Sequence, residues 1–157
     1  MSTVTYFDSP IGKIGVIDNG TAITNIFAGD MQVPSDDKAG ISALGERAKV
    51  QFSEYFSGKR KIFDFPMKFE GTDFQKAVWT ALLQIPFGNA VAYSDIAETV
   101  GSPKAYRAVG SAVGKNPLLI VVPCHRIIAK HRKLGGFSAG INVKKQLLKI
   151  EEIEYKG

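Results

Sequence analysis

The sequence has few of the residues that build disulfides and metal sites. Among 157 residues it has one cysteine, Cys124, and two histidines, His125 and His131. A lone cysteine cannot form an internal disulfide, which suits a reducing compartment, so we expect the cytoplasm, or the nucleus in a eukaryotic source. The same counts argue against a four-ligand structural zinc site. We therefore expect neither a metal nor a disulfide framework.

Long apolar runs are also absent. No stretch of 18 or more apolar residues occurs, so no transmembrane helix is expected. The first ten residues, MSTVTYFDSP, lack the basic start and apolar stretch of a secretory signal. An apolar fraction of 45% and a mean hydropathy of −0.01 are typical of a globular protein with one core or two small ones.

The positive charge is confined to one half of the chain. Residues 71–157 contain 12 Lys and Arg against 6 Asp and Glu, a net charge of +6, whereas residues 1–70 contain 8 against 9, a net charge of −1. This division favours two domains, 1–70 and 71–157, of which the second binds a polyanion. Uneven surface charge without a partner explains the counts equally well, so composition leaves both interpretations open.

The pattern of residues 1–70 predicts a small sheet followed by a helix. Three short stretches are rich in β-branched and aromatic residues, and Asn19-Gly20 between two of them is a strong hairpin signal. We expect an antiparallel meander, a polar loop over residues 30–40, and a helix over Ser42–Phe56. The predicted strands are Thr3–Phe7, Lys13–Ile17 and Ala22–Phe27.

The pattern of residues 71–157 predicts a mostly helical domain. Thr72 and Gln75 form a capping-box pattern that begins an amphipathic helix ending near Gln84. A C-terminal helix, which Asn142 is expected to cap, leads to Glu151.

Two short helices lie between these two. Ser94 is expected to cap the first, Asp95–Val100, and Ser102 to cap the second, which begins at Pro103 and ends at Gly114. Two short helices joined by a tight turn that contains glycine form the helix-turn-helix pattern. Many helical proteins contain such pairs, so this pattern alone does not establish DNA binding.

Cys124 lies after Pro123, at the end of the apolar run Leu118–Val122. The proline fixes its own φ and restricts the residue before it, so the cysteine is expected on a constrained turn. His125 follows directly, and a thiol needs a neighbouring base or positive charge to become a nucleophilic thiolate. A lone cysteine is more often a small buried apolar residue. The combination favours a reactive thiol, but the residues alone leave both interpretations open.

The stretch NPLLIVVPCHRII, residues 116–128, resembles the signature of the O6-alkylguanine-DNA alkyltransferases, also called methylated-DNA–protein-cysteine methyltransferases. The resemblance continues through TDFQKAVW, IPFGNAVAYSDIA and YRAVGSAVGKNP upstream and GGFSAGINVKKQLLKIE downstream, and covers nearly all of residues 72–151. Residues 1–70 are similar only in size and arrangement. The resemblance implies an α/β (α+β) fold: a small N-terminal antiparallel-sheet-plus-helix domain of ribonuclease H-like type, then a mostly helical winged helix-turn-helix domain.

The resemblance implies DNA repair by direct reversal, without a cofactor. An alkyl group on the O6 atom of guanine, with O4-alkylthymine as a further candidate, is transferred once and irreversibly to Cys124. His125 takes the thiol proton through a water, and Glu151 orients the imidazole. The implied partner is double-stranded DNA carrying the lesion. The protein is expected to bind no membrane and to be monomeric off DNA.

Further residues receive a role from the same resemblance. Asn116 holds the cysteine turn, Tyr93 helps to protonate the departing guanine, and Arg107 fills the gap in the DNA stack when the nucleotide is flipped out. The implied DNA-backbone contacts are Ser94, Ser102 and Lys130, and the implied base-pocket residues are Phe137, Ser138 and Ile127.

Two departures from the family pattern and three rival functions bear on this interpretation. The chain lacks the N-terminal cysteines and histidines with which some members bind zinc, and Ala139 replaces a glycine beside the base pocket, which leaves the range of bulky substrates open. Non-catalytic alkyltransferase-like proteins carry another residue, commonly tryptophan, in place of the cysteine, so Cys124 argues against that function. A cysteine hydrolase lacks its surrounding signature here. A helix-turn-helix regulator needs a regulatory domain for which this chain is too short.

Overall fold

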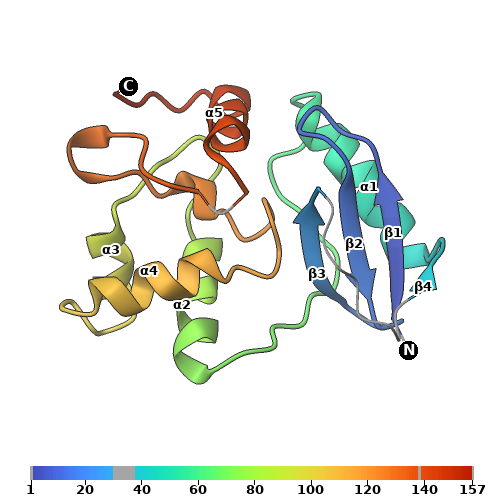
Figure 1. The fold of residues 1–157 in the computed structure, drawn as a ribbon, viewed down its shortest axis with the longest axis horizontal. Coiled ribbons are helices and arrows are strands. Elements are labelled where there is room, and N and C mark those ends of the chain that lie inside the picture. Colours follow the sequence, from blue (N-terminus) through green and yellow to red (C-terminus); the bar gives the residue numbers. More distant parts are fainter. Residues whose placement is uncertain (1, 30–37, 138, 157) are drawn as a thin grey trace. The chain divides into compact units, whose positions relative to one another are not determined.

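The computed structural model describes residues 2–29, 38–137 and 139–156, which form two compact units (Figure 1). The N-terminal unit extends to Glu70 and includes Pro117–Leu119, and the C-terminal unit comprises Gly71–Asn116 and the chain from Ile120 onward. The architecture is mixed α and β, as predicted, with a sheet and one long helix in the first unit and a mainly helical second unit. Within these described ranges, no helix is long and apolar enough to cross a membrane.

The sheet of the N-terminal unit has the strand order β3-β2-β1-β4. β1 (Thr3–Phe7) pairs antiparallel with β2 (Ile14–Asp18), and β2 pairs antiparallel with β3 (Ile23–Ala28), which confirms the predicted meander. The prediction of a loop up to residue 40 was wrong at its end, because Lys38–Ala39 form a short strand, β4, that is parallel to β1. This strand pairs with backbone groups that the edge of β1 otherwise leaves unpaired.

The helix α1 (Ala43–Phe56) covers one face of this sheet (Figure 1) and contacts β1 and β2. Ser42 is its N-cap rather than its first residue, because the Ser42 side chain accepts the Gly45 N–H at 2.9 Å. Phe52 of α1 packs against Phe7 of β1, with ring centroids 5.7 Å apart. The apolar side chains that α1 buries are Ala48, Phe52 and Tyr55.

A segment from later in the chain extends the β3 side of the N-terminal sheet. Ile26 donates its N–H to the Pro117 carbonyl at 2.8 Å, and the Ile26 carbonyl accepts the N–H of Leu119 at 3.2 Å. The intervening Leu118 is fully buried. The next residue after this segment, Ile120, has a φ of 72°, which is unusual for a β-branched residue.

The C-terminal unit groups three helices that contact one another, α2, α3 and α4, and a separate helix α5 (Figure 1). The predicted capping box at the start of α2 is confirmed: Thr72 Oγ1 accepts the Gln75 N–H at 3.1 Å, and Gln75 Oε1 accepts the Thr72 N–H at 2.9 Å. Trp79 Nε1 donates to the Ala112 carbonyl at 2.9 Å and joins α2 to α4. The helices are α2 (Asp73–Leu83), α3 (Tyr93–Thr99), α4 (Tyr106–Gly114) and α5 (Ile141–Ile150).

Helix α3 begins two residues earlier than predicted. Asp95 Oδ2 accepts the N–H of Ala92 at 2.8 Å, so Ala92 is the N-cap and Tyr93 the first helical residue. Ser94 therefore lies in the first turn and does not cap the helix. An aspartate at the third helical position competes with a serine for the cap because it can reach back to an unpaired N–H group.

The starts of α4 and α5 also differ from the prediction. Ala105 donates its N–H to the Ser102 carbonyl in a turn and has non-helical angles (φ −90°, ψ 41°), so α4 begins at Tyr106 and Ser102 does not cap it. Gly140, with a φ of 104°, precedes α5 and places Asn142 inside the helix. A φ in this range favours glycine, which explains why Gly140 is the residue before α5.

Candidate functional site

The turn that carries Cys124 is held by backbone hydrogen bonds on both sides of the cysteine. Pro123 (φ −81°, ψ 64°) is the centre of an inverse γ-turn, in which the Cys124 N–H donates to the Val122 carbonyl at 2.8 Å. A short 3₁₀ turn, Cys124–Arg126, follows, and the Arg126 N–H donates to the Pro123 carbonyl at 3.0 Å. The cysteine therefore lies on a constrained turn, as its position after a proline predicts.

Asn116 joins this turn to the end of α4. Its Nδ2 donates to the Val122 carbonyl at 2.7 Å and lies 3.2 Å from Cys124 Sγ. The same amide group therefore fixes the backbone before the cysteine and donates to the sulfur. A hydrogen bond to the charged form of an acid favours that form, so Asn116 stabilises a Cys124 thiolate.

The Cys124 thiol lies in an environment where burial and charge have opposite effects. The residue is 4% exposed, and burial raises the pKa of its thiol, whereas Asn116 and the positive charge of Lys144 lower it. Lys144, from α5, is 1% exposed and donates from Nζ to the carbonyls of Ile127 at 2.8 Å and Gly136 at 3.2 Å. Burial lowers the pKa of Lys144, and a negative charge on Cys124 raises it. Thiolate and ammonium therefore stabilise each other.

His125 and Glu151 form a fully buried pair. Their Nε2 and Oε2 atoms are 2.5 Å apart, and both side chains are 0% exposed. Burial lowers the pKa of His125, so its imidazole is neutral near pH 7. Since the carboxylate accepts a hydrogen bond at Nε2, the basic nitrogen is Nδ1, which is buried and has no hydrogen-bond partner among the described residues. The imidazole is thus arranged to accept a proton at Nδ1.

Arg126 binds the same carboxylate from the other side. Its Nε donates to Glu151 Oε1 at 2.6 Å, its Nη1 donates to the Ile85 carbonyl at 2.6 Å, and the Gly88 N–H donates to Glu151 Oε1 at 3.3 Å. Burial raises the pKa of Glu151, but the hydrogen bonds from His125 and Arg126 and the positive charge of Arg126 outweigh it and lower that pKa to about 2. Glu151 is therefore ionised at neutral pH.

Arg126 and Lys144 belong to this cluster, although neither has a role predicted from the sequence. Arginine is mostly found at the surface, and nothing in the Pro-Cys-His-Arg motif indicates that this side chain is buried. Lys144 has a clearer signal, because buried residues recur at intervals of three or four along α5 and its C-cap: Lys144, Leu147, Leu148 and Glu151. That spacing places a cation and an anion on the apolar face of a helix, where charges are rarely found unpaired.

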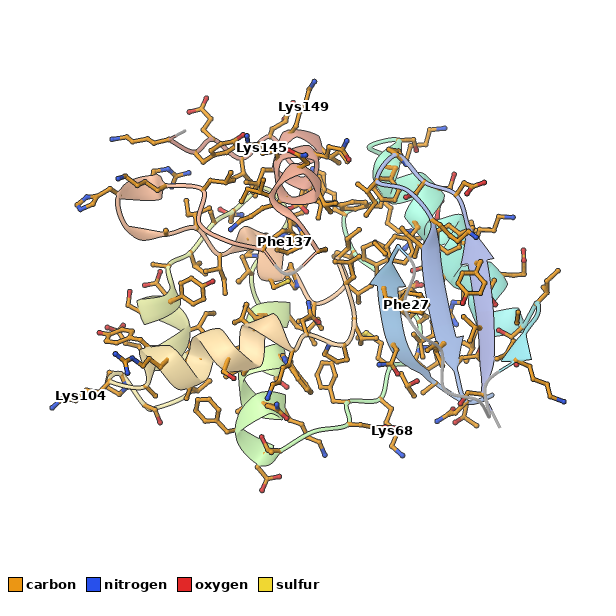
Figure 2. The ribbon with its side chains drawn as sticks, viewed as in Figure 1. Phe27, Lys68, Lys104, Phe137, Lys145 and Lys149 are labelled. Atoms are coloured by element: carbon orange, nitrogen blue, oxygen red, sulfur yellow. The ribbon has the colours of Figure 1, made fainter. Side chains whose placement is uncertain are left out.

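A small cavity opens beside the thiol. Its volume is about 160 Å³, below the ~300–1,000 Å³ of pockets for drug-sized ligands. Cys124, Tyr93 and Phe137, which lies on the loop before α5 (Figure 2), line it together with three glycines and Val113. Ser138 lies outside the described residues, and Ile127 is buried and is not among the side chains that line the cavity. Burial and the charge of Cys124 raise the pKa of Tyr93, so its phenol stays protonated.

Three of the four residues predicted to contact DNA, Ser94, Ser102 and Arg107, belong to α3, α4 and the turn between them, whereas Lys130 begins a later 3₁₀ turn, Lys130–Arg132. Ser94 in α3 and Ser102 in the turn are half-buried, and the side chain of Lys130 lies outside the described part of the protein. Lys104 extends from the turn before α4 (Figure 2).

Helix α4 connects this surface with the cavity. Arg107, near its start, is exposed, and Gly110 and Gly114 of the same helix line the cavity. Residues three and four positions apart lie on the same face of a helix, so Arg107 shares its face with the two cavity glycines.

Together these residues bring a thiol, a neutral imidazole and an ionised carboxylate into one buried cluster. Among the residues that the structure describes, no group of three His, Cys, Asp or Glu is arranged to hold a metal ion. The arrangement supports nucleophilic attack by the Cys124 sulfur on a small electrophile in the cavity.

Two family models match the chain, one for each half. The ribonuclease-like domain of 6-O-methylguanine DNA methyltransferase matches residues 3–69, and the DNA binding domain of the same protein matches residues 73–153.

Individual proteins match over nearly the full chain. The methylated-DNA–protein-cysteine methyltransferase of Haemophilus influenzae is 40% identical over 155 residues, 96% of this chain and 87% of that protein. The constitutive methylated-DNA–protein-cysteine methyltransferase of Bacillus subtilis is 41% identical over 164 residues, 99% of each chain. The crystal structure of Mycobacterium tuberculosis OGT in complex with DNA has a TM-score of 0.90 and 39% identity, covering 96% of this chain and 92% of that one.

Proposed function

The chain belongs to the 6-O-methylguanine DNA methyltransferase family, and on that basis we propose that it repairs DNA by moving an alkyl group from the O6 atom of guanine to Cys124 Sγ. The relatives named above are methylated-DNA–protein-cysteine methyltransferases, and the M. tuberculosis structure holds DNA. One observation in this chain carries the proposal: a buried thiol, bonded by Asn116, lines the same small cavity as Tyr93 and Phe137.

The transfer is a displacement at a saturated carbon. The Cys124 thiolate attacks the alkyl carbon in line, from about 3–3.5 Å, as the bond to O6 breaks and the guanine leaves with the electron pair. The thiol proton passes through a water to His125 Nδ1, and the Glu151 carboxylate stabilises the imidazolium that forms. Asn116 holds the sulfur in a fixed position, which orients it for in-line attack.

Tyr93 assists the leaving group. Its phenol stays protonated and lines the cavity, so it can donate to the guanine as negative charge develops on the base. Phe137 supplies an apolar surface for the flat ring, and Ser138 follows it directly in the sequence.

The substrate is duplex DNA with the damaged nucleotide flipped out, because the O6 atom is otherwise hidden in the base stack. Arg107, on the cavity face of α4, fills the space that the nucleotide leaves, and Ser94, Ser102 and Lys130 contact the backbone. The net charge of +6 in residues 71–157 supports this assignment of residues 71–157 as the DNA-binding and acceptor domain.

The protein acts once, as a monomer. A thioether is stable, and the chain has no second cysteine to regenerate the first. Because the acceptor must stay a free thiol, the activity belongs in a reducing compartment such as the cytoplasm.

The test is the mass of the intact protein after incubation with duplex DNA containing O6-methylguanine. We expect a gain of one methyl group on Cys124 and a plateau at about one group per protein, as for a covalent acceptor that is never released. Cys124→Ser should gain no methyl group and still bind the duplex. Turnover beyond the plateau, or an unchanged mass, would contradict the proposal.

A further inference from the structure

Among the residues that the structure describes, two side chains bind the Glu151 carboxylate, and of these two only Arg126 is charged at neutral pH. Oε2 lies against His125 Nε2 at 2.5 Å, and Oε1 accepts the Arg126 Nε–H at 2.6 Å. Burial keeps His125 neutral, whereas a guanidinium does not lose its proton in proteins. The negative charge of Glu151 is therefore balanced by Arg126 and not by the imidazole.

We propose that Arg126 is a positioning residue for alkyl transfer, which holds Glu151 ionised and oriented so that His125 stays neutral and able to accept the Cys124 proton. This inference rests on the proposed function, because it concerns the proton acceptor of that reaction. It adds Arg126 to the proton relay of Cys124, His125 and Glu151 that the proposed function contains.

The chain segment after α2 holds the guanidinium in place. Arg126 Nη1 donates to the Ile85 carbonyl at 2.6 Å, and the guanidinium lies 5.8 Å from the centre of the Phe87 ring. The Gly88 N–H reaches the same carboxylate oxygen as Arg126 Nε, at 3.3 Å. A guanidinium fixed at both Nε and Nη1 has a defined plane, which a lysine ammonium cannot reproduce. The carboxylate is thus oriented by a rigid partner.

The charges around His125 explain why this partner matters. Glu151 favours the protonated imidazole, whereas burial and the positive charges of Arg126 and Lys144 oppose it. Two further ionisable groups belong to the site. Cys124 precedes His125 in the sequence, and Tyr93, whose pKa is raised by burial and by the charge of Cys124, keeps its proton. Without Arg126, its guanidinium no longer balances the negative charge of Glu151. Protonation of His125 then becomes more favourable, because the imidazolium can balance that charge. A protonated imidazole cannot accept the thiol proton, so transfer should become sensitive to acid.

The experiment compares Arg126→Gln and Arg126→Lys with a matched control from the N-terminal unit. Arg60 also binds a glutamate through Nε, at 3.0 Å from Glu54, and a backbone carbonyl through Nη1, at 2.9 Å from Ile62. Arg60→Gln therefore loses the same kind of contacts without touching the site. The rate of methyl transfer from duplex DNA is measured from pH 5.5 to 9. Each rate is normalised to the amount of protein that can accept a methyl group.

We expect Arg126→Gln to react at least ~10-fold more slowly than wild type at pH 7, with most of the deficit recovered at pH 9. Arg126→Lys keeps the charge, so its transfer rates should lie between those of the wild type and Arg126→Gln. Arg60→Gln should have the pH profile of the wild type. An Arg126→Gln profile parallel to that of the wild type would reduce Arg126 to a buried structural ion pair and overturn the proposal.

A second measurement needs neither DNA nor a substituted Arg126. Nitrogen NMR of the wild-type histidines, assigned with a His131→Gln variant, should show a neutral His125 that is protonated at Nε2 across pH 6–8. A charged His125 in that range overturns the proposal even if Arg126→Gln does not fold. A wild-type protein that accepts no methyl group would instead refute the proposed function, and the NMR result separates the two failures.

Discussion

Each unit of this protein contains an arginine that binds a glutamate through Nε and a backbone carbonyl through Nη1. In the N-terminal unit the pair is Arg60–Glu54, at 3.0 Å, with side chains 25% and 39% exposed. In the C-terminal unit it is Arg126–Glu151, at 2.6 Å, with side chains 8% and 0% exposed. An exposed pair gains little because water screens it, whereas a buried pair must overcome the desolvation of both charges. The same ion pair is therefore weakened by solvent screening in the N-terminal unit, whereas in the C-terminal unit it is opposed by the desolvation of both charges.

The two arginine–glutamate pairs lie in different surroundings. The N-terminal unit packs aromatic rings around Phe63, whose centroid lies 4.8 Å from Phe52 and 5.5 Å from Tyr55, and the Arg60 pair lies outside this core. In the C-terminal unit the Arg126 pair lies within a buried cluster of ionisable groups that includes His125 and Lys144. Perturbed and buried ionisable groups occur preferentially where chemistry is performed. We infer that the buried pair is maintained for its effect on His125, and four predictions test this contrast.

The largest effect is expected for Glu151→Gln. The amide cannot stabilise a charged His125, so methyl transfer at pH 7 should slow by ~10- to 10⁴-fold, the range of general-base and orienting effects. Raising the pH toward 9 should restore part of the rate, because hydroxide then supplies the thiolate. The measurement is single-turnover transfer from duplex DNA. Glu152→Gln, in the exposed neighbouring residue, should react like the wild type, and a wild-type rate for Glu151→Gln would remove this carboxylate from the mechanism.

Acid should destabilise the C-terminal unit through the same carboxylate. The pKa of Glu151 falls from 4.5 to about 2 on folding, so its contribution is complete above pH 4.5 and is lost as the pH falls toward 2. The difference corresponds to roughly 3 kcal/mol of unfolding free energy. The lowered pKa of His125 adds a further loss as the pH falls below 6.5.

Urea unfolding followed by fluorescence measures this loss. Trp79 is the one tryptophan of the chain and is buried in the C-terminal unit, so its emission follows that unit. In Glu151→Gln, the unfolding free energy should depend less steeply on pH between pH 4.5 and 3 than in the wild type. An equally steep dependence in that variant would mean that other carboxyl groups cause the loss.

A smaller effect is expected for Lys144→Met. The substitution keeps most of the side-chain volume and removes the cation that lowers the pKa of Cys124, so alkylation of the thiol by iodoacetamide at pH 7 should slow by roughly 10-fold. Lys145→Met is the matched control, because Lys145 is the exposed neighbour on α5 (Figure 2). Equal rates for the two variants would show that Lys144 serves only to hold the carbonyls of Ile127 and Gly136.

Features with a local cause were predictable from the sequence, and features with a distant cause were not. The three-stranded meander and the capping box at Thr72 depend on neighbouring residues, and both are confirmed. The strand β4 depends on pairing with β1, so two residues in a polar stretch gave no signal. Ser94 failed as a cap because Asp95 competes for the same role.

The site shows the same division between local and distant causes. Pro123, Cys124 and His125 are adjacent, so a constrained turn with a thiol and a base is visible in the motif. The resemblance to a known family contributed Asn116 and Glu151, and the structure places both within hydrogen-bond distance of the motif. The inward position of Arg126 depends on the Ile85 carbonyl, 41 residues away in sequence, and no local pattern predicts it.

The smallest effect is expected for Glu54→Gln, the N-terminal counterpart of Glu151→Gln. The substitution removes the charge that faces Arg60 Nε but leaves the Glu54 carbonyl, which accepts the N–H groups of Lys59 and Arg60. Only a partly exposed ion pair is lost, so the unfolding free energy should fall by less than about 1 kcal/mol. High salt should reduce the difference further, because the screening length shrinks to about 3 Å at 1 M. Urea unfolding followed by circular dichroism at 0.05 M and 1 M salt measures both quantities. A loss as large as that for Glu151→Gln at neutral pH would show that burial does not distinguish the two pairs, and the contrast between the units would then have to be explained by something other than desolvation.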